Sequence, residues 1–172
     1  MKIIELSLDN VPASEEEISL CLGYFDGVHL GHQQIINEAK KEGYPVAVLT
    51  FDDSPSRLLG FKDKYELSTL ADKAYWFEKF GVEYFYIMHF DESTLRVTKD
   101  EFINTILKKI NPKTIFCGKD YSFGVRGEGT PEYLNKFFNV HALDLLSSNK
   151  EKISSTAIRN YVLNGPIESA NE

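Results

Sequence analysis

The sequence of 172 residues has few cysteines and no hydrophobic run long enough to span a bilayer. Its two cysteines lie inside apolar stretches, LCLG at Cys21 and IFCG at Cys117, so we expect reduced, buried thiols and no disulfide framework. The N-terminus lacks an apolar core followed by a small-residue cleavage site. These absences favour a cytoplasmic protein that does not enter membranes.

Positive charge is also scarce. The chain has 26 acidic and 19 basic side chains, which gives a formal net charge of −7 at pH 7. Nucleic-acid binding needs clustered cations that neutralise phosphates, so no nucleic-acid partner is expected. An anionic small ligand would have to be bound by local donors. The apolar fraction of 42% is ordinary for a globular chain that buries a full core.

Apolar strands and amphipathic helices alternate along the chain. A short strand is expected at 3–6, before a polar connector at 7–17, and the strands of the main sheet at 18–24, 45–51, 84–89, 114–117 and 140–143. The expected helices are 31–41, 69–80, 99–110, 131–138 and 155–163, with an extended segment at 145–153. This order predicts one α/β domain with a Rossmann-like, doubly wound parallel sheet of about five strands.

Ligands of such sheets bind beyond the carboxyl ends of the strands. Four segments should therefore gather at one edge of the sheet: 23–32, 50–55, 89–91 and 118–129.

The segment LCLGYFDGVHLGHQQII, residues 20–36, reads as a strand, a tight turn and a helix start. Gly23 and Gly27 allow close approach of the backbone or positive φ, and the helix start offers unpaired N–H groups to an anion. His29 and His32 are three residues apart and can face one ligand. Alternatively, one histidine caps the helix and the other packs. Zinc is not expected, because no acidic residue lies at a metal-ligand offset.

A second candidate anion site is ISSTAIR, residues 153–159. Ser154 or Ser155 is suited to cap a helix, Thr156 lies in its first turn, and Arg159 shares that helix face. Taken alone, this pattern is also that of a capped helix with a solvated arginine. Together, the two sites suggest an extended polyphosphate held between two helix N-termini.

These residues resemble a known family. GYFDGVHLGH followed by ISSTAIR is similar to the nucleotidylyltransferase superfamily. The blocks FDGVHLGHQ, LTF, FCGKDYSFG and KISSTAIRNYVLNG resemble, in order, the FMN adenylyltransferase (FAD synthetase) module of prokaryotic bifunctional riboflavin kinase/FAD synthetases. The resemblance covers nearly the whole chain. It implies transfer of the adenylyl group of ATP to FMN, which gives FAD and pyrophosphate.

The resemblance also implies roles for individual residues. The implied catalytic residues are His29, His32 and Arg159, and the implied ATP-binding residues are Gly23, Phe25, Asp26, Gly27, Ser155 and Thr156. The implied flavin-side residues are Thr50, Asp120, Tyr121, Phe123 and Arg126, although Tyr121 and Phe123 could equally fill core under the loop. Mg²⁺ is expected on the phosphates of ATP, without a set of protein ligands.

The sequence departs from the family's pattern at two places. Many members read T-F-x-P-H-P where this chain has Asp53 and Ser54 in place of the first proline and the histidine. The riboflavin kinase module is absent from 1–172, so a separate riboflavin kinase is expected to supply FMN. These departures leave two alternatives: a non-catalytic paralogue that binds a flavin or nucleotide, and a nucleotidylyltransferase with another phosphate acceptor.

Overall fold

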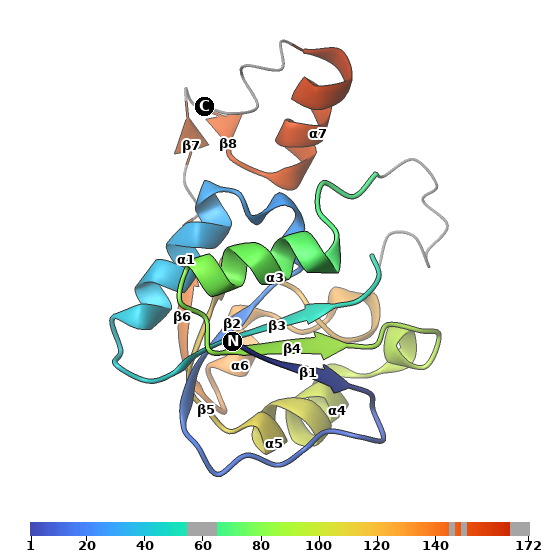
Figure 1. The fold of residues 1–172 in the computed structure, drawn as a ribbon. Helices are drawn as coiled ribbons and strands as arrows, with labels where there is room; N and C mark the ends of the chain where they lie inside the picture. The colour runs from blue at the N-terminus through green and yellow to red at the C-terminus, as the bar shows by residue number, and fades with distance from the viewer. Residues whose placement is uncertain (55–64, 145–146, 149–150, 166–172) are drawn as a thin grey trace.

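A parallel β-sheet forms the middle layer of the protein, in a computed structural model that describes residues 1–54, 65–144, 147–148 and 151–165. Within these residues the main sheet has six strands in the order β1-β4-β3-β2-β5-β6 (Figure 1). Every neighbouring pair is parallel. The strands are β1 (Lys2–Leu6), β2 (Ile18–Leu22), β3 (Val46–Phe51), β4 (Tyr84–Met88), β5 (Pro112–Gly118) and β6 (Asn139–Leu143).

Helices cover both faces of this sheet. Figure 1 shows α1 (Leu30–Lys40) and α3 (Leu70–Lys79) on one face, with α4 (Lys99–Glu101) and α5 (Lys108–Ile110) on the other. A π-helical segment, Phe102–Leu107, joins α4 to α5. The remaining elements are short 3₁₀ turns at Asp26–Val28, Thr94–Arg96 and Val125–Gly127, then α6 (Pro131–Leu134), the antiparallel pair β7 (Ser147–Ser148) and β8 (Glu151–Lys152), and α7 (Ser155–Asn164). No described helix has the length and apolar character needed to cross a bilayer.

The two faces of the sheet pack into two cores because side chains alternate along each strand. Leu20 and Leu22 of β2 face the cluster that contains Ile103 and Ile106, whereas Cys21 between them faces the cluster of α1 and α3. β2 is buried along its whole length, as expected for a strand that is covered on both sides. Cys21 and Cys117 are buried free thiols, as predicted.

The predicted α/β class and doubly wound parallel sheet are confirmed, but the strand count of about five was too low. The segment predicted as a separate strand at 3–6 joins the sheet as β1, paired with β4 from Lys2 opposite Tyr84 to Leu6 opposite Met88. The local pattern could not reveal this, because the partner strand is far along the chain. β1 is exposed over most of its length, as an edge strand is.

Two other segments also differ from the prediction. The helix expected at 131–138 ends at Leu134, where Asn135 leaves the helix and accepts a hydrogen bond from the backbone N–H of Val140 at the start of β6. Part of the extended segment expected at 145–153 is the β7–β8 pair. Residues 145–146 and 149–150 lie outside the described residues, as does Pro55 of the segment 50–55.

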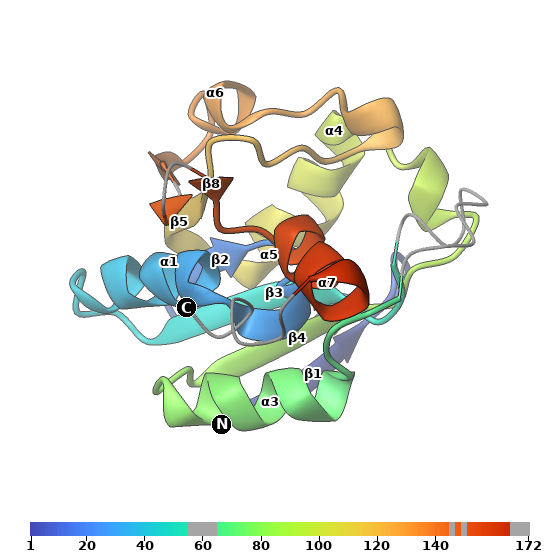
Figure 2. The same ribbon diagram turned by 90° about the horizontal axis from the view of Figure 1, so that it is seen from above.

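The strand order reverses direction between β2 and β5. From β2 the chain proceeds to β3 and β4 on one side, and the later strands β5 and β6 lie on the other. The loops that follow β2 and β5 therefore start next to each other at the carboxyl edge, which is where doubly wound folds bind ligands. Seen from above, α7 lies over this edge (Figure 2).

The loop that follows β5 is packed tightly on the start of α4, and Gly124 makes this packing possible. Its φ is +73°, and a Cβ there would lie 2.7 Å from the backbone nitrogen of Lys99. Gly124 also has a ψ of 174°, a backbone conformation that is essentially restricted to glycine. Gly124→Ala should therefore lower the free energy of unfolding by about 1–3 kcal/mol from the backbone and by about 1–3 kcal/mol more from overpacking. Urea denaturation measures the sum of the two contributions.

Gly43→Ala is the control for a positive φ without crowding, because Gly43 has a φ of +76° but no atom within 4 Å of the added Cβ. It should lose only the backbone contribution, about 1 kcal/mol. Equal losses in the two variants would contradict the packing of the loop on α4.

Candidate active site

The turn between β2 and α1 has an unusual backbone. Phe25 and Val28 have positive φ angles of 55° and 40°, and Gly27 has a φ of 77°. Positive φ is rare outside glycine and exceptional for a β-branched residue such as valine. Such strain persists only where the surroundings fix it. The Phe25 ring is completely buried, and a Cβ on Gly23 would lie 3.0 Å from that ring.

The carboxylate of Asp26 holds this turn to two other segments. Only 2% of Asp26 is exposed. Its Oδ1 accepts hydrogen bonds from the backbone N–H groups of Leu67 (2.8 Å) and Ser68 (3.0 Å), and its Oδ2 pairs with the guanidinium of Arg159. The Ser68 hydroxyl accepts from the Gly27 N–H at 2.8 Å. A buried carboxylate with this many donors fixes the geometry of everything bonded to it.

His29 and His32 lie side by side at the start of α1. Their rings stack with centroids 3.6 Å apart, and His32 also packs against the Phe25 ring at 5.0 Å. His29 is the N-cap, because its Nδ1 accepts from the backbone N–H of His32 at 3.4 Å. A neutral His29 therefore carries its proton on Nε2. The alternative in which one histidine caps the helix and the other packs is thus correct for His29 and His32.

The surroundings of His32 favour its neutral form. Burial, the neighbouring His29 and the charge of Lys73 lower its pKa well below the usual 6.5. Its Nδ1 is buried and has no hydrogen-bond partner among the described residues. A buried polar atom without a partner is costly, and a bound ligand could supply the missing hydrogen bond.

The second motif reaches the same turn from the far end of the chain. Ser154 caps α7 by accepting from the N–H of Ala157 at 3.2 Å, which was one of the two predicted caps. Ser155 instead donates its hydroxyl proton to the carbonyl of Asp26 at 2.8 Å. Arg159 donates from Nε to the Tyr65 carbonyl at 2.6 Å and from Nη2 to Asp26. Thr156 is exposed in the first turn of the helix. The structure therefore brings the two predicted anion sites together.

Sequence reasoning missed Lys73 of α3. This lysine is 1% exposed and donates to the Tyr24 carbonyl at 2.8 Å, where the Thr50 hydroxyl also donates at 2.9 Å. The position of Lys73 in the sequence could have revealed it. Lys73 follows Leu70 by three residues and precedes Phe77 by four, so it lies on the apolar face of the helix, where a cation is unexpected.

The predicted flavin-side residues take different positions. Thr50 is buried at the end of β3, and Phe123 is buried against Phe102, with ring centroids 5.3 Å apart. Tyr121 stacks on Phe123 at 5.9 Å, so the two aromatic side chains do fill core beneath the loop. Asp120 and Arg126 are exposed. Their contact with a flavin stays a prediction.

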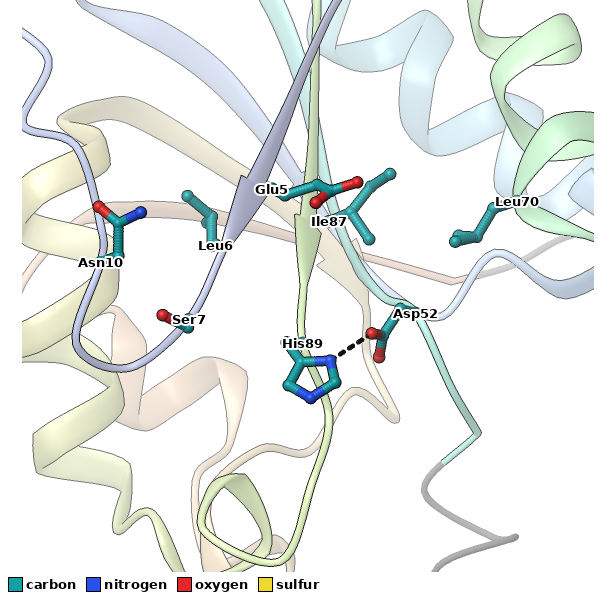
Figure 3. Close-up of a pocket in the computed structure, with 8 residues that line it drawn as sticks. All are labelled: Glu5, Leu6, Ser7, Asn10, Asp52, Leu70, Ile87 and His89. Atoms are coloured by element: carbon teal, nitrogen blue, oxygen red, sulfur yellow. Dashed lines mark hydrogen bonds and ion pairs between the residues drawn. The ribbon is translucent and has the colours of Figure 1, made fainter.

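A separate polar cavity of about 380 Å³ opens at the carboxyl ends of β1, β4 and β3 (Figure 3). His89 and Asp52 pair inside it, with Nδ1 and Oδ2 2.6 Å apart. The other lining residues are Glu5, Leu6, Ser7, Asn10, Leu70 and Ile87. No predicted site residue lines this cavity. Its carboxylates also disfavour an anion, so we place the site at the turn after β2.

No group of three or more His, Cys, Asp or Glu side chains in the described part of the chain could hold a metal ion.

Comparison with known proteins decides the family. Residues 11–157 match the protein family described as FAD synthetase. The chain belongs to the FAD synthetase family. It is 37% identical over 163 residues to the bifunctional riboflavin kinase/FMN adenylyltransferase of Listeria monocytogenes, a match that covers 89% of this chain and 52% of that protein. The bifunctional enzyme of the same name from Bacillus subtilis is 35% identical over 183 residues, covering 99% and 58%.

A solved structure has a similar fold. A crystal structure described as a macrolide-efflux protein from Streptococcus pneumoniae matches with a TM-score of 0.85 and 31% identity, covering 98% of this chain and 58% of that one. The chain spans about half the length of the curated relatives it matches. The resemblance inferred from the motifs is thus confirmed at the level of the family.

The pKa values of His32 and His89 should be shifted in opposite directions from the usual 6.5. His89 is exposed, and the Asp52 carboxylate bonded to it raises its pKa above 6.5. The pKa of His32 is lowered. The unfolded chain binds a proton that folded His32 does not, so His32 reduces the free energy of unfolding as the pH falls below 6.5. The contribution of His89 is present below 6.5 and is lost as the pH rises through its folded pKa.

NMR titration of the imidazole C–H resonances measures both values. Asp52→Asn should return the midpoint of His89 towards 6.5 and leave that of His32 unchanged. Midpoints near 6.5 for both histidines in the unsubstituted protein would contradict the burial and pairing described here.

Proposed function

We propose that the protein transfers the adenylyl group of ATP to FMN, giving FAD and pyrophosphate. One observation carries the proposal. Two motifs whose residues Asp26 and Arg159 are 133 positions apart meet in one cluster, with two helix N-termini, two histidines and a guanidinium. This is a set of donors for an extended chain of phosphates. The names of the Listeria and Bacillus relatives support the choice of FMN as the acceptor.

The reaction needs little covalent chemistry from the protein. A phosphate oxygen of FMN attacks the α-phosphorus of ATP, the bond from that phosphorus to the bridging oxygen breaks, and pyrophosphate leaves with the electron pair. Because the FMN phosphate is already an anion, no general base is required. The protein positions the two phosphates and neutralises the charge that develops between them.

His29, His32 and Arg159 are the proposed catalytic residues. The histidines offer ring N–H groups at the start of α1, and Arg159 uses only Nε and Nη2 within the described residues. Its other guanidinium N–H groups remain for the β- or γ-phosphate, beside the hydroxyls of Ser155 and Thr156.

The other proposed ATP-binding residues shape the turn that receives the nucleotide. Gly23 and Gly27 keep the backbone open to a ligand, as the φ of Gly27 and the lack of room for a Cβ on Gly23 support. Phe25 and Asp26 are buried, so their proposed contribution to ATP binding is to hold the turn in place.

The proposed flavin subsite lies across the switch point, in the loop that follows β5. Asp120 and Arg126 are exposed there, and Arg126 would meet the FMN phosphate. Thr50, Tyr121 and Phe123 would support that loop from the core.

Mg²⁺ would enter with ATP as part of the substrate. The ion would be held mainly by phosphate and water oxygens. Its chemistry when bound would be to neutralise phosphate charge.

We also propose that residues 1–172 form a single FMN adenylyltransferase-like domain and that a riboflavin kinase supplies its FMN. The bifunctional names of the relatives support the pairing of the two activities. The two buried, free thiols support a reducing, cytoplasmic setting.

The test of the function is to incubate the purified chain with ATP, Mg²⁺ and FMN, with separation of flavins by chromatography. FAD and pyrophosphate should form in equal amounts. Tight flavin binding without turnover would instead indicate a non-catalytic paralogue. Pyrophosphate release only with another phosphate compound would indicate a different acceptor.

His32→Ala and Arg159→Ala should each lower kcat by about 10²–10³-fold, because both remove donors to the charge of the transition state. Steady-state kinetics separate this from a change in KM alone, which would mean ground-state binding only. His141→Gln is the matched control, since His141 is exposed on β6, and it should keep the original kcat.

A further inference from the structure

Lys73 is a buried cation with unusually few partners. Its ammonium lies 2.8 Å from the Tyr24 carbonyl oxygen and 3.8 Å from the centroid of the Tyr24 ring. No carboxylate of the described residues is within ion-pair distance of it. One hydrogen bond and one ring contact are little compensation for a side chain that is 1% exposed.

The fold gains little from this charge. Burial lowers the pKa of Lys73 to about 8, against the opposing influence of Asp26 and Glu66. At neutral pH the unfolded lysine holds its proton more readily than the folded one, so the buried charge opposes folding. The Tyr24 carbonyl would still accept a hydrogen bond from Thr50 if Lys73 were apolar. We therefore look for a role of the Lys73 charge other than stabilising the fold.

The bonded carbonyl is at a critical place in the chain. It belongs to the peptide plane between Tyr24 and Phe25, where the backbone enters the strained turn with a φ of 55° at Phe25. Two donors on this one oxygen restrict rotation of that plane. The turn leads directly to His29 and His32, so a rotation of the plane would displace both rings.

We propose that Lys73 is a positioning residue for adenylyl transfer, which holds the Tyr24–Phe25 peptide so that His29 and His32 stay aligned with the reacting phosphates. This inference rests on the proposed function. Lys73 contacts no proposed reacting atom and acts through the backbone of the turn.

Lys73→Met tests the proposal, because it keeps the length and packing of the side chain but removes the charge and the donor. The matched control is Lys79→Met on the same helix. Lys79 is exposed and also lies over a tyrosine ring, 5.5 Å from the centroid of Tyr75. Lys73→Met should lower kcat about 10²-fold, the loss typical of a small misplacement of catalytic groups, with KM for ATP near its original value.

The melting temperature separates positioning from a structural role. It should change by less than about 4 °C in Lys73→Met, and both kcat and melting temperature should be unchanged in Lys79→Met. An unchanged kcat in Lys73→Met would overturn the proposal. A Lys73→Met chain that does not fold would overturn it as well, because Lys73 would then be required for the fold.

Hydrogen exchange provides a readout that does not depend on turnover. The amide of Val28 donates to the Phe25 carbonyl at 3.2 Å within the turn, and it should exchange faster in Lys73→Met than in Lys79→Met. Equal exchange would overturn the proposal. If the unsubstituted protein made no FAD, the proposed function would fail, while faster exchange of Val28 would still show that Lys73 fixes the turn.

Discussion

The site depends on the hydrogen bonds and the ion pair of the Asp26 carboxylate. This carboxylate is nearly inaccessible to water, and it bonds the segment before α3, the turn after β2 and the guanidinium of Arg159 at once. Removing one partner of such a buried pair leaves an uncompensated charge. The donors that surround the Asp26 carboxylate fix the strained turn in one conformation and hold α7 over it. This role matters more than any contribution of the ion pair to stability.

The fold places this arrangement at the point where the strand order reverses. The turn after β2 and the loop after β5 begin side by side, and the proposed function assigns the nucleotide to the first and its acceptor to the second. Above them α7 brings the hydroxyls of Ser155 and Thr156, and below them Lys73 holds the backbone. In the proposed reaction the donors of this site are in place before the substrate binds, and they stabilise the negative charge that develops in the transition state.

Much of this could be predicted from sequence, because alternating apolar strands and amphipathic helices are local patterns. The pairing of β1 with β4 and the bond between Asp26 and Arg159 are not local, since spacing along the chain does not show which distant groups meet. The motifs gave both halves of the site, including Asp26 as an implied ATP-binding residue, but not the bond by which Asp26 joins them. Lys73 was missed because a lysine within a helix is ordinarily solvated, although its place on an apolar stripe was visible.

A double-mutant cycle on Asp26 and Arg159 measures directly whether these side chains join the two motifs into one site. The free energies of unfolding of Asp26→Asn, Arg159→Met and the double variant are compared by urea denaturation. Strong coupling, about 2 kcal/mol, is the predicted result, because each single change leaves a buried charge or its neighbours without a partner. Strict additivity of the two single changes would contradict it.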